Sequence, residues 1–364
     1  MIRQKIAPSD LVRSHDEGES EMRQRIGIVA GGLFLLGALA VSANAQEVSF
    51  KGKTVNILIG FGAGGEDDAW AHLIAQHLGK HLPGTPTIVP QNVPGAGSLR
   101  VANQIYNVSP KDGTAIGMIN RGVPFEPLLG GKGTQFDPLK INFVGSPSID
   151  TTVCAARKDA AVQTMQDLFS KELVVGATGS GADTATYPEF LSRLLGMKFK
   201  IVTGYPGSRE IGVAMERNEV QAICLAYDSL MRQTLAREGK VNILFQAALQ
   251  PDPRLKDVPL GTALAHSESD RQALTLFFAR VQMGRPFIAP PGLAPDVLQA
   301  LRQGFADTLR DPAFVETAEK QSLRIKLTSG EEMGRFLAEI YKTPPEVVKR
   351  TAQALGYLDD AKAK

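Results

Sequence analysis

Short β-type runs alternate with helical patterns along most of this chain, and no other feature restricts its fold as strongly. This alternation is typical of an α/β architecture built on parallel sheets. Strands are expected at 54–59, 86–90, 115–119, 151–155, 172–176, 199–203, 220–225 and 241–246. Helices are expected between them at 68–82, 98–107, 183–195, 208–217 and 228–238, and then at 295–309, 312–321, 329–342 and 344–355.

Two segments have the character of crossings between domains. Residues 145–156 read GSPSIDTTVCAA and residues 284–293 read GRPFIAPPGL, with prolines that hold the backbone extended. The sequence therefore predicts domain 1 at 47–148 plus 286–364 and domain 2 at 149–285. Two crossing strands would form a hinge between them.

The N-terminal residues 1–45 have the order of a secretory signal peptide. Basic residues precede the apolar run 26–41, which ends in Ala-Asn-Ala at 43–45. The run is shorter than the roughly 20 residues that a membrane-spanning helix needs. We predict cleavage after Ala45 and export from the cytoplasm, with Met22 as an alternative start and an uncleaved anchor as the alternative interpretation.

Composition narrows the classes of function. The formal net charge is +2, only 6% of the residues are aromatic, and no block of basic residues occurs, which argues against a role at nucleic acids or membrane surfaces. The chain has two cysteines, Cys154 and Cys224. In an oxidising compartment they are compatible with one disulfide and equally with two buried free thiols.

The first glycine-rich segment has the spacing of a dinucleotide-binding turn, Gly60-x-Gly62-x-x-Gly65. That fold also needs an acidic residue about 20 positions further on, but residues 83–98 contain no Asp or Glu. A phosphate loop is excluded as well, because Glu66 and Asp67 stand where Lys and Ser or Thr are required. We therefore predict no nucleotide cofactor. What remains is a glycine turn that brings backbone N–H groups at a helix start close to a ligand oxygen.

Three further glycine-rich turns precede expected helices: NVPGAGS at 92–98, VGATGSGAD at 175–183 and TGYPGSRE at 203–210. Ligands of open α/β sheets lie at the carboxyl ends of the strands, where such turns are found. Turns from two domains would hold one small molecule between opposed helix starts. The alternative is that each is a tight turn without a ligand.

Six segments together carry a resemblance to a known family. They are GAGGEDDAWAHLIAQHLGKHLPG (62–84), NVPGAGSLRVAN (92–103), SPKDGTAIG (109–117), GATGSGAD (176–183), GYPGSREIGVAMERNEVQA (204–222) and RPFIAPPGLAPDVLQALR (285–302). From about Lys53 to the C-terminus the chain resembles the extracytoplasmic solute receptors of tripartite tricarboxylate transporters, which are periplasmic binding proteins.

The resemblance implies a two-lobed Venus-flytrap fold that closes on a small carboxylate or amino-acid-like ligand and delivers it to membrane permease subunits. It implies no catalytic residues, no metal and no cofactor. By motif match, it places the ligand against Phe61, Gly62, Ala63, Gly64, Gly65, Asp68, Thr178, Gly179, Ser180, Gly181, Asp183, Tyr205, Pro206, Gly207 and Asp228.

The chain departs from the family pattern at Glu66 and Asp67, where relatives usually carry glycine, small or aromatic residues. Like charge beside a ligand carboxylate is costly. This disfavours citrate-like ligands and favours a monocarboxylate, an amino acid whose amine pairs with an acid, or a neutral solute. The preferred alternative is that both acids face solvent at the positive end of a helix dipole. His72 stands where the family generally has arginine.

Other kinds of site have less support. His77 and His81 are four residues apart on an expected helix, but a third zinc ligand is missing, so we interpret them as structural. No Gly-x-Ser-x-Gly motif occurs, and nothing in the sequence supports a triad that uses His266. The prediction is a receptor without enzymatic activity, and the alternatives are an exported enzyme or a ligand sensor that uses the same cleft.

Overall fold

The computed structural model describes residues 48–179 and 181–358, which form one compact unit. The predicted signal peptide, with its alternative start at Met22, lies outside the described residues. None of the helices in the described part of the chain combines the length and apolarity needed to cross a membrane.

The first sheet has the strand order β11-β4-β10-β3-β1-β2. Its strands are β1 (Thr54–Ile59), β2 (Thr87–Asn92), β3 (Ala115–Met118), β4 (Asn142–Ser146), β10 (Phe287–Ala289) and β11 (Thr328–Ser329). The strands β2, β1 and β3 pair in parallel, whereas β10 and β11 pair antiparallel with their neighbours.

The second sheet has the order β7-β6-β8-β5-β9. Its strands are β5 (Thr152–Arg157), β6 (Leu173–Gly176), β7 (Phe199–Val202), β8 (Ala222–Ala226) and β9 (Val241–Ala247). Here β7, β6 and β8 are parallel, and β5 is antiparallel to both of its neighbours.

Both sheets are therefore mixed, which corrects the prediction of parallel sheets. A parallel pair needs a crossover connection, usually a helix, to return the chain to the same edge of the sheet. The strands β5 and β10 are the first strands after the chain passes from one sheet to the other. They enter a sheet without such a crossover, so nothing forces them to run parallel.

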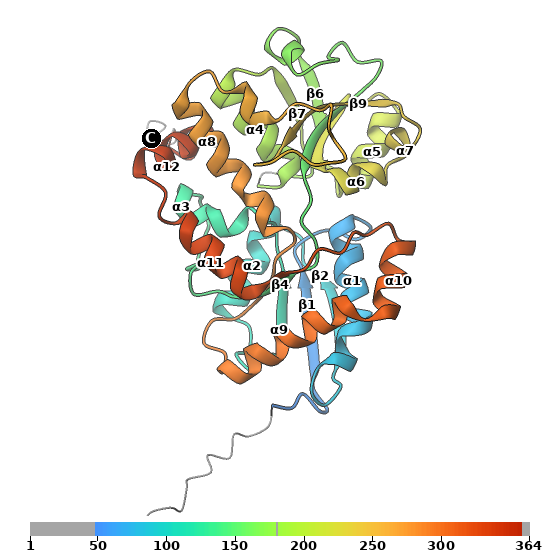
Figure 1. Cartoon of the computed structure of the whole chain (residues 1–364), viewed down its shortest axis with the longest axis vertical. Helices are drawn as coiled ribbons and strands as arrows, with labels where there is room; N and C mark the ends of the chain where they lie inside the picture. The colour runs from blue at the N-terminus through green and yellow to red at the C-terminus, as the bar shows by residue number, and fades with distance from the viewer. Residues whose placement is uncertain (1–47, 180, 359–364) are drawn as a thin grey trace, which may run out of the picture. The chain divides into compact units, whose positions relative to one another are not determined.

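Twelve α-helices in the described part surround the two sheets (Figure 1). They are α1 (Glu66–Leu78), α2 (Leu99–Asn107), α3 (Glu126–Leu129), α4 (Asp183–Leu195), α5 (Ser208–Glu216), α6 (Tyr227–Met231), α7 (Thr234–Arg237), α8 (Glu268–Phe278), α9 (Pro295–Arg310), α10 (Pro312–Lys320), α11 (Gly330–Ile340) and α12 (Pro345–Ala354). The helix expected at 228–238 is divided into α6 and α7, and α8 was not expected.

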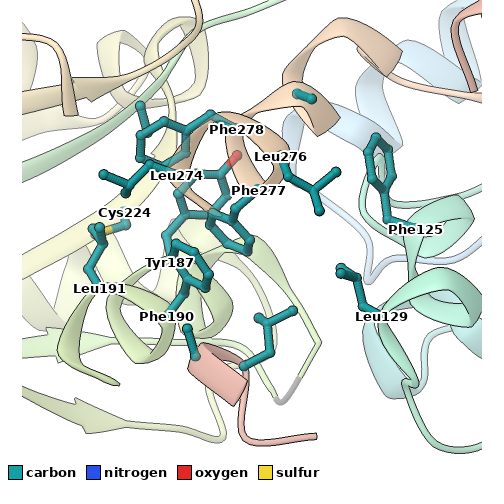
Figure 2. Close-up of a cluster of buried hydrophobic side chains, with 14 of the residues drawn as sticks. Phe125, Leu129, Tyr187, Phe190, Leu191, Cys224, Leu274, Leu276, Phe277 and Phe278 are labelled. Atoms are coloured by element: carbon teal, nitrogen blue, oxygen red, sulfur yellow. The ribbon is translucent and has the colours of Figure 1, made fainter. Parts of the chain in front are cut away.

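Helix α8 packs against α4 through a cluster of buried aromatic side chains (Figure 2). The ring of Phe277 stacks on Phe190 of α4 with 3.9 Å between centroids, and Tyr187 meets it edge-on. Helix α12 packs against both α4 and α8, as Figure 1 shows. The C-terminal helix thus lies with the helices of the second sheet although its sequence was assigned to domain 1. The domain boundaries themselves stay a prediction.

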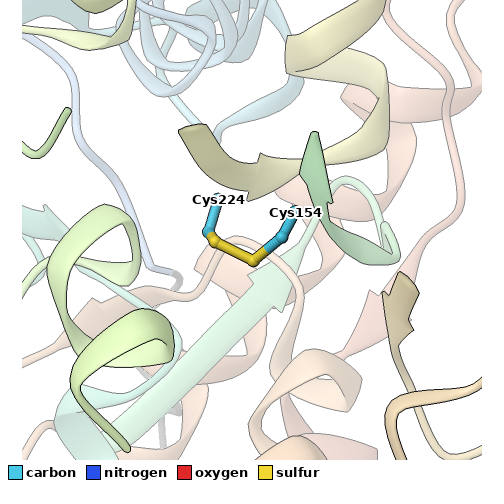
Figure 3. Close-up of a disulfide and its surroundings, with 2 residues drawn as sticks. All are labelled: Cys154 and Cys224. Atoms are coloured by element: carbon cyan, nitrogen blue, oxygen red, sulfur yellow. A yellow bond between two sulfur atoms is a disulfide. The ribbon is translucent and has the colours of Figure 1, made fainter. Parts of the chain in front are cut away.

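Cys154 and Cys224 form a disulfide between β5 and β8 (Figure 3). The two residues are direct partners in the antiparallel register of these strands, and both are buried. The structure therefore decides between the two alternatives that the sequence left open, in favour of the bridge.

Candidate functional site

A cavity of about 300 Å³ lies where the loops of the two sheets meet. Each of the six parallel strands contributes residues that follow its carboxyl end. The lining residues are Gly60, Phe61, Gly62, Gly65, Glu66, Asp67, Pro94, Gly95, Ala96, Gly97, Ile119, Asn120, Arg121, Thr178, Gly179, Ala182, Asp183, Thr184, Tyr205, Pro206, Gly207, Ser208, Leu225, Ala226, Ser229, Gly284 and Arg285. This is the position at which open α/β sheets bind ligands.

Three helices start at this cavity without a side-chain cap. Helices α1, α4 and α5 follow Gly65, Ala182 and Gly207, and none of these residues caps its helix with a side-chain hydrogen bond. Side-chain caps occur on α8, α10 and α11, from Ser267, Asp311 and Ser329, whereas the remaining helices of the described part also start without one. The first N–H groups of a helix have no partner within the helix, so those at the cavity are available to an anionic oxygen.

The glycine-rich loops of the two sheets touch each other beside the cavity. A Cβ atom on Gly62 would lie 3.1 Å from the carbonyl oxygen of Pro206. A Cβ atom on Gly97, whose φ is +59°, would lie 2.5 Å from the carbonyl carbon of Gly181. Glycine is required at Gly97 both for the backbone angle and for this close approach.

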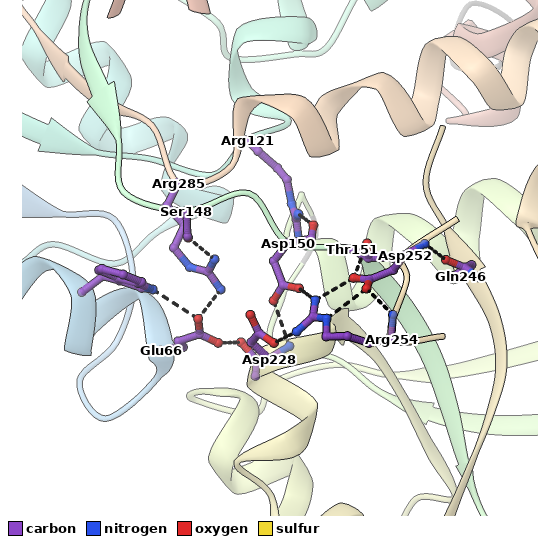
Figure 4. A network of polar contacts seen from close by, with 12 residues as sticks. Glu66, Arg121, Ser148, Asp150, Thr151, Asp228, Gln246, Asp252, Arg254 and Arg285 are labelled. Carbon is purple, nitrogen blue, oxygen red and sulfur yellow. Dashed lines mark hydrogen bonds and ion pairs between the residues drawn. The ribbon is translucent and has the colours of Figure 1, made fainter. Parts of the chain in front are cut away.

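Arg285 contacts both acids that the sequence singled out, and Figure 4 shows its contact with Glu66. Its Nη2 lies 2.7 Å from Oε1 of Glu66, and its Nε lies 3.1 Å from Oδ1 of Asp67. Glu66 also accepts hydrogen bonds from the Trp70 indole at 3.2 Å and from the Ser229 hydroxyl. Glu66 is only 7% exposed, so the expectation that both acids face solvent is wrong. A cation more than 200 positions away in the chain contacts both of them, which the local sequence does not show.

A second buried ion pair closes the cavity from the side of β3. Arg121 donates from Nε to Asp183 at 2.7 Å and from Nη1 to the carbonyl of Asp150 at 3.0 Å. Asn120 donates to the other oxygen of Asp183 at 3.2 Å. Burial alone would lower the pKa of Arg121, but the adjacent Asp183 carboxylate outweighs it and raises that pKa above its usual value.

Asp67 differs from the other charged lining residues because its carboxylate is partly accessible, with 33% of the side chain exposed. Burial is the main cause that raises the pKa of Asp67, and the nearby charges of Glu66 and Asp183 act in the same direction. Arg285 and Arg121 oppose the shift.

Asp228 belongs to a polar cluster beside the cavity and not to its lining (Figure 4). Its carboxylate pairs with Arg254, and its backbone N–H donates to Asp150 at 2.9 Å. Arg254 also contacts Asp252 at 2.6 Å. Asp150 lies in the segment that crosses from β4 to β5, and burial, together with Asp228 and Glu66, raises its pKa to about 6.

The structure brings nine of the predicted ligand-binding residues to the cavity, and their role in binding stays a prediction. They are Phe61, Gly62, Gly65, Thr178, Gly179, Asp183, Tyr205, Pro206 and Gly207. Four others, like Asp228, are not among the lining residues: Ala63, Gly64, Asp68 and Gly181. Asp68 instead accepts hydrogen bonds from Gly64 and Asn92 and so holds the first loop together. Ser180 lies outside the described residues.

Sequence reasoning missed the two arginines, Asn120 and Ser229. Signals for some of them were present, because Arg285 opens a quoted segment of the resemblance and Arg121 follows an expected strand. The turn at 92–98 was recognised but was not assigned to the site.

The histidines considered for other chemistry have structural contacts. His81 lies 2.8 Å from Asp311, His77 packs edge-on to Phe314, and His266 packs against Phe169. Within residues 48–179 and 181–358, no group of three or more metal-ligating side chains is placed to hold an ion.

Comparison with known proteins gives consistent results. The family model described as "Tripartite tricarboxylate transporter family receptor" matches residues 71–353. A UPF0065 protein from the gbd 5′ region of Cupriavidus necator is 24% identical over 343 residues, covering 91% of this chain and 97% of that protein.

Solved structures confirm the expected two-lobed periplasmic-binding-protein fold. The periplasmic binding protein BugD has a TM-score of 0.63 at 19% identity, covering 85% of this chain and 97% of its own. MatC from Rhodopseudomonas palustris, solved with bound malate, has a TM-score of 0.63 at 20% identity. The match covers 81% of this chain and 98% of the MatC chain.

Proposed function

The chain belongs to the tripartite tricarboxylate transporter receptor family, and from this premise we propose that it binds one small carboxylate-containing molecule in the cavity and delivers it to membrane permease subunits. The proposal places the protein in the periplasm after removal of the signal peptide at 1–45.

The observation that carries the proposal is the convergence of three uncapped helix starts on one cavity. The guanidinium groups of Arg121 and Arg285 are already paired with protein carboxylates. Backbone N–H groups at the starts of α1, α4 and α5 therefore supply the donors for a ligand carboxylate. Such groups bind an anion through the helix dipole and the missing intrahelical partners.

The proposal includes no catalytic step. The lining residues include hydroxyl groups on Thr178, Thr184, Ser208 and Ser229, but the described lining contains no histidine or lysine. The acid that Ser229 contacts, Glu66, is already held in an ion pair with Arg285. General base catalysis needs a titratable partner within hydrogen-bond reach of the nucleophile. Closure of the two lobes on the ligand is the event that the permease would recognise.

A thermal-shift screen tests the proposal on protein that has been unfolded and refolded to remove bound solute. The probes are monocarboxylates, dicarboxylates, tricarboxylates, amino acids and NAD. A ligand at 100 times its dissociation constant adds about 2.7 kcal/mol to the free energy of unfolding if it binds only the native state. We expect at least one carboxylate to give such a shift, and a shift with NAD alone would overturn the proposal.

Gly179→Val provides the variant for this screen. Gly179 lines the cavity, and a Cβ atom there meets nothing within 4 Å, so valine would fill ligand space without a clash. Gly334→Val on α11 is the matched control, because its Cβ also meets nothing and Gly334 lies outside the lining. We expect Gly179→Val to unfold cooperatively and to lose the ligand shift, while Gly334→Val keeps it. Retained binding in both variants would contradict this site.

A further inference from the structure

We propose that the ligand is a small zwitterion with one carboxylate and one ammonium group, and that the ammonium group lies against Asp67. This inference rests on the proposed function, because it takes the backbone donors of the cavity as the site of the ligand carboxylate. It adds the class of molecule that the cavity selects.

The first argument is the charge of the cavity wall. The lining contains the carboxylates of Glu66, Asp67 and Asp183, and it contains the guanidinium groups of Arg121 and Arg285. Three acids against two bases leave one formal negative charge. A further carboxylate, Asp68, lies next to this wall, and its partners among the described residues are the neutral donors of Gly64 and Asn92 and the ring of His72.

The second argument is that all but one of these carboxylates already have their partners. Both oxygens of Glu66 accept hydrogen bonds, from Trp70 and from Ser229, and Arg285 pairs with the first of them. Both oxygens of Asp183 accept as well, from Asn120 and Arg121. Both side chains are also largely buried, with 4% of Glu66 and 11% of Asp183 exposed, so Asp67 is the more accessible acceptor of the three.

Asp67 is the exception. Among the described residues its cationic contact is Nε of Arg285 at 3.1 Å, and that nitrogen makes no hydrogen bond although the Arg285 side chain is 93% buried. No hydrogen bond to the Asp67 carboxylate is formed within the described part of the chain. With a third of its side chain exposed at the cavity, Asp67 has acceptor capacity that an ammonium group would use.

The same wall disfavours a second carboxylate on the ligand. A dicarboxylate would bring a further negative charge to a wall that is already negative, and both guanidinium groups of the described lining, those of Arg121 and Arg285, are already in ion pairs. Like charges at close range in a partly dehydrated site are strongly unfavourable. An amino monocarboxylate avoids this cost because its own ammonium group neutralises Asp67.

A rival explanation is that Asp67 becomes protonated and donates a hydrogen bond to an amine-free carboxylate. The charged groups that face Asp67 are Arg285 and Arg121, which favour its ionised form, and Glu66 and Asp183, which oppose it. The two explanations predict opposite pH dependence. Affinity for a zwitterion rises as Asp67 ionises, whereas affinity for a plain monocarboxylate falls.

The test uses isothermal titration of the refolded protein with butyrate, 2-aminobutyrate, 4-aminobutyrate and succinate, which share one chain length. Each is titrated at several pH values between 4 and 8. The variant is Asp67→Asn, and the matched control is Asp296→Asn. Asp296 is the second residue of α9 as Asp67 is the second residue of α1, but it is exposed and outside the lining.

We expect an aminobutyrate to bind more tightly than butyrate, with succinate weakest and affinity for the aminobutyrate rising with pH. A hydrogen-bonded charge contact contributes about 1.5–3 kcal/mol, so Asp67→Asn should weaken aminobutyrate about tenfold or more and strengthen succinate. Asp296→Asn should change neither. If Asp67→Asn fails to fold, the pH dependence of the wild-type protein still distinguishes the two explanations.

Two outcomes would overturn this inference. Succinate binding as tightly as the aminobutyrates would show that the wall tolerates a second carboxylate, and tighter butyrate binding at low pH would show that Asp67 acts as a proton donor. Either result leaves the carboxylate receptor intact. Absence of a shift with every carboxylate and amino acid in the thermal screen would instead refute the proposed function.

Discussion

Arg121 and Asp183 form an ion pair that links the loops of the first sheet to those of the second, with 2.7 Å between Nε and Oδ2. Each of the two side chains is about nine-tenths buried. Arg121 follows β3 in the first sheet, and Asp183 begins α4 beside the second. The pair therefore ties the two sides of the cavity together.

Replacing Arg121 by methionine should destabilise the protein strongly. The change leaves Asp183 as a buried carboxylate without its cation, and breaking a buried pair in this way typically costs about 3–5 kcal/mol. Arg217→Met is the control, because Arg217 and its partner Glu219 are both exposed and such pairs contribute about 1 kcal/mol or less. Urea unfolding monitored by Trp70 fluorescence measures both. Equal losses for the two variants would show that the buried pair has no special role.

Gly97→Ala should separate the loops that meet at the cavity. The new Cβ atom would lie 2.5 Å from the Gly181 carbonyl carbon, and the residue would keep a left-handed φ of +59°. Gly196→Ala is the matched control, because Gly196 has a φ of +75° and nothing within 4 Å of its Cβ. The backbone strain alone costs about 1–2 kcal/mol in each variant. We expect only Gly97→Ala to weaken ligand binding in addition, and unchanged affinity would show that the loop contact is dispensable.

Removal of the disulfide should lower the free energy of unfolding without changing the affinity for the ligand. The bridge joins residues 70 positions apart, and closing a loop of that size contributes about 4 kcal/mol in the chain-entropy model. The double variant Cys154→Ala/Cys224→Ala should therefore unfold at lower urea concentration, while its affinity below the transition stays that of the wild type. A stability equal to the wild type would mean that the denatured chain is equally restricted without the bridge.

Stability should depend on pH through Asp150. Burial raises its pKa from 3.8 to about 6 in the folded protein, so the folded state holds a proton there that the unfolded state has lost. The stabilising contribution is present below about pH 4 and is lost as the pH rises to about 6, which corresponds to about 3 kcal/mol. Asp150→Asn should remove this part of the slope, and Asp296→Asn should not. A slope that both variants share with the wild type would contradict this assignment.

Local sequence was sufficient for the elements that repeat a regular pattern. The strand at 54–59 and the helix at 183–195 occur with the predicted bounds. The local sequence also revealed the glycine turns, because a backbone with positive φ, or one that approaches a neighbouring group closely, requires glycine at that position. The resemblance to the family rested on the order and spacing of six sequence segments.

Tertiary structure decided what depends on residues that are distant in the chain. The three residues of β10 and the two of β11 become strands only because β3 and β4 offer them hydrogen-bond partners. The mixed direction of both sheets and the pairing of Cys154 with Cys224 arise in the same way.

The site shows the same division. The sequence by itself determined that glycine-rich loops and helix starts follow the parallel strands, because local residue types encode turns and helix starts. It did not determine the electrostatics of the cavity, because Glu66 and Asp67 acquire their cation from Arg285 only when the crossing segment folds beside α1. Charge interactions depend on distance in space, and only the folded chain defines that distance.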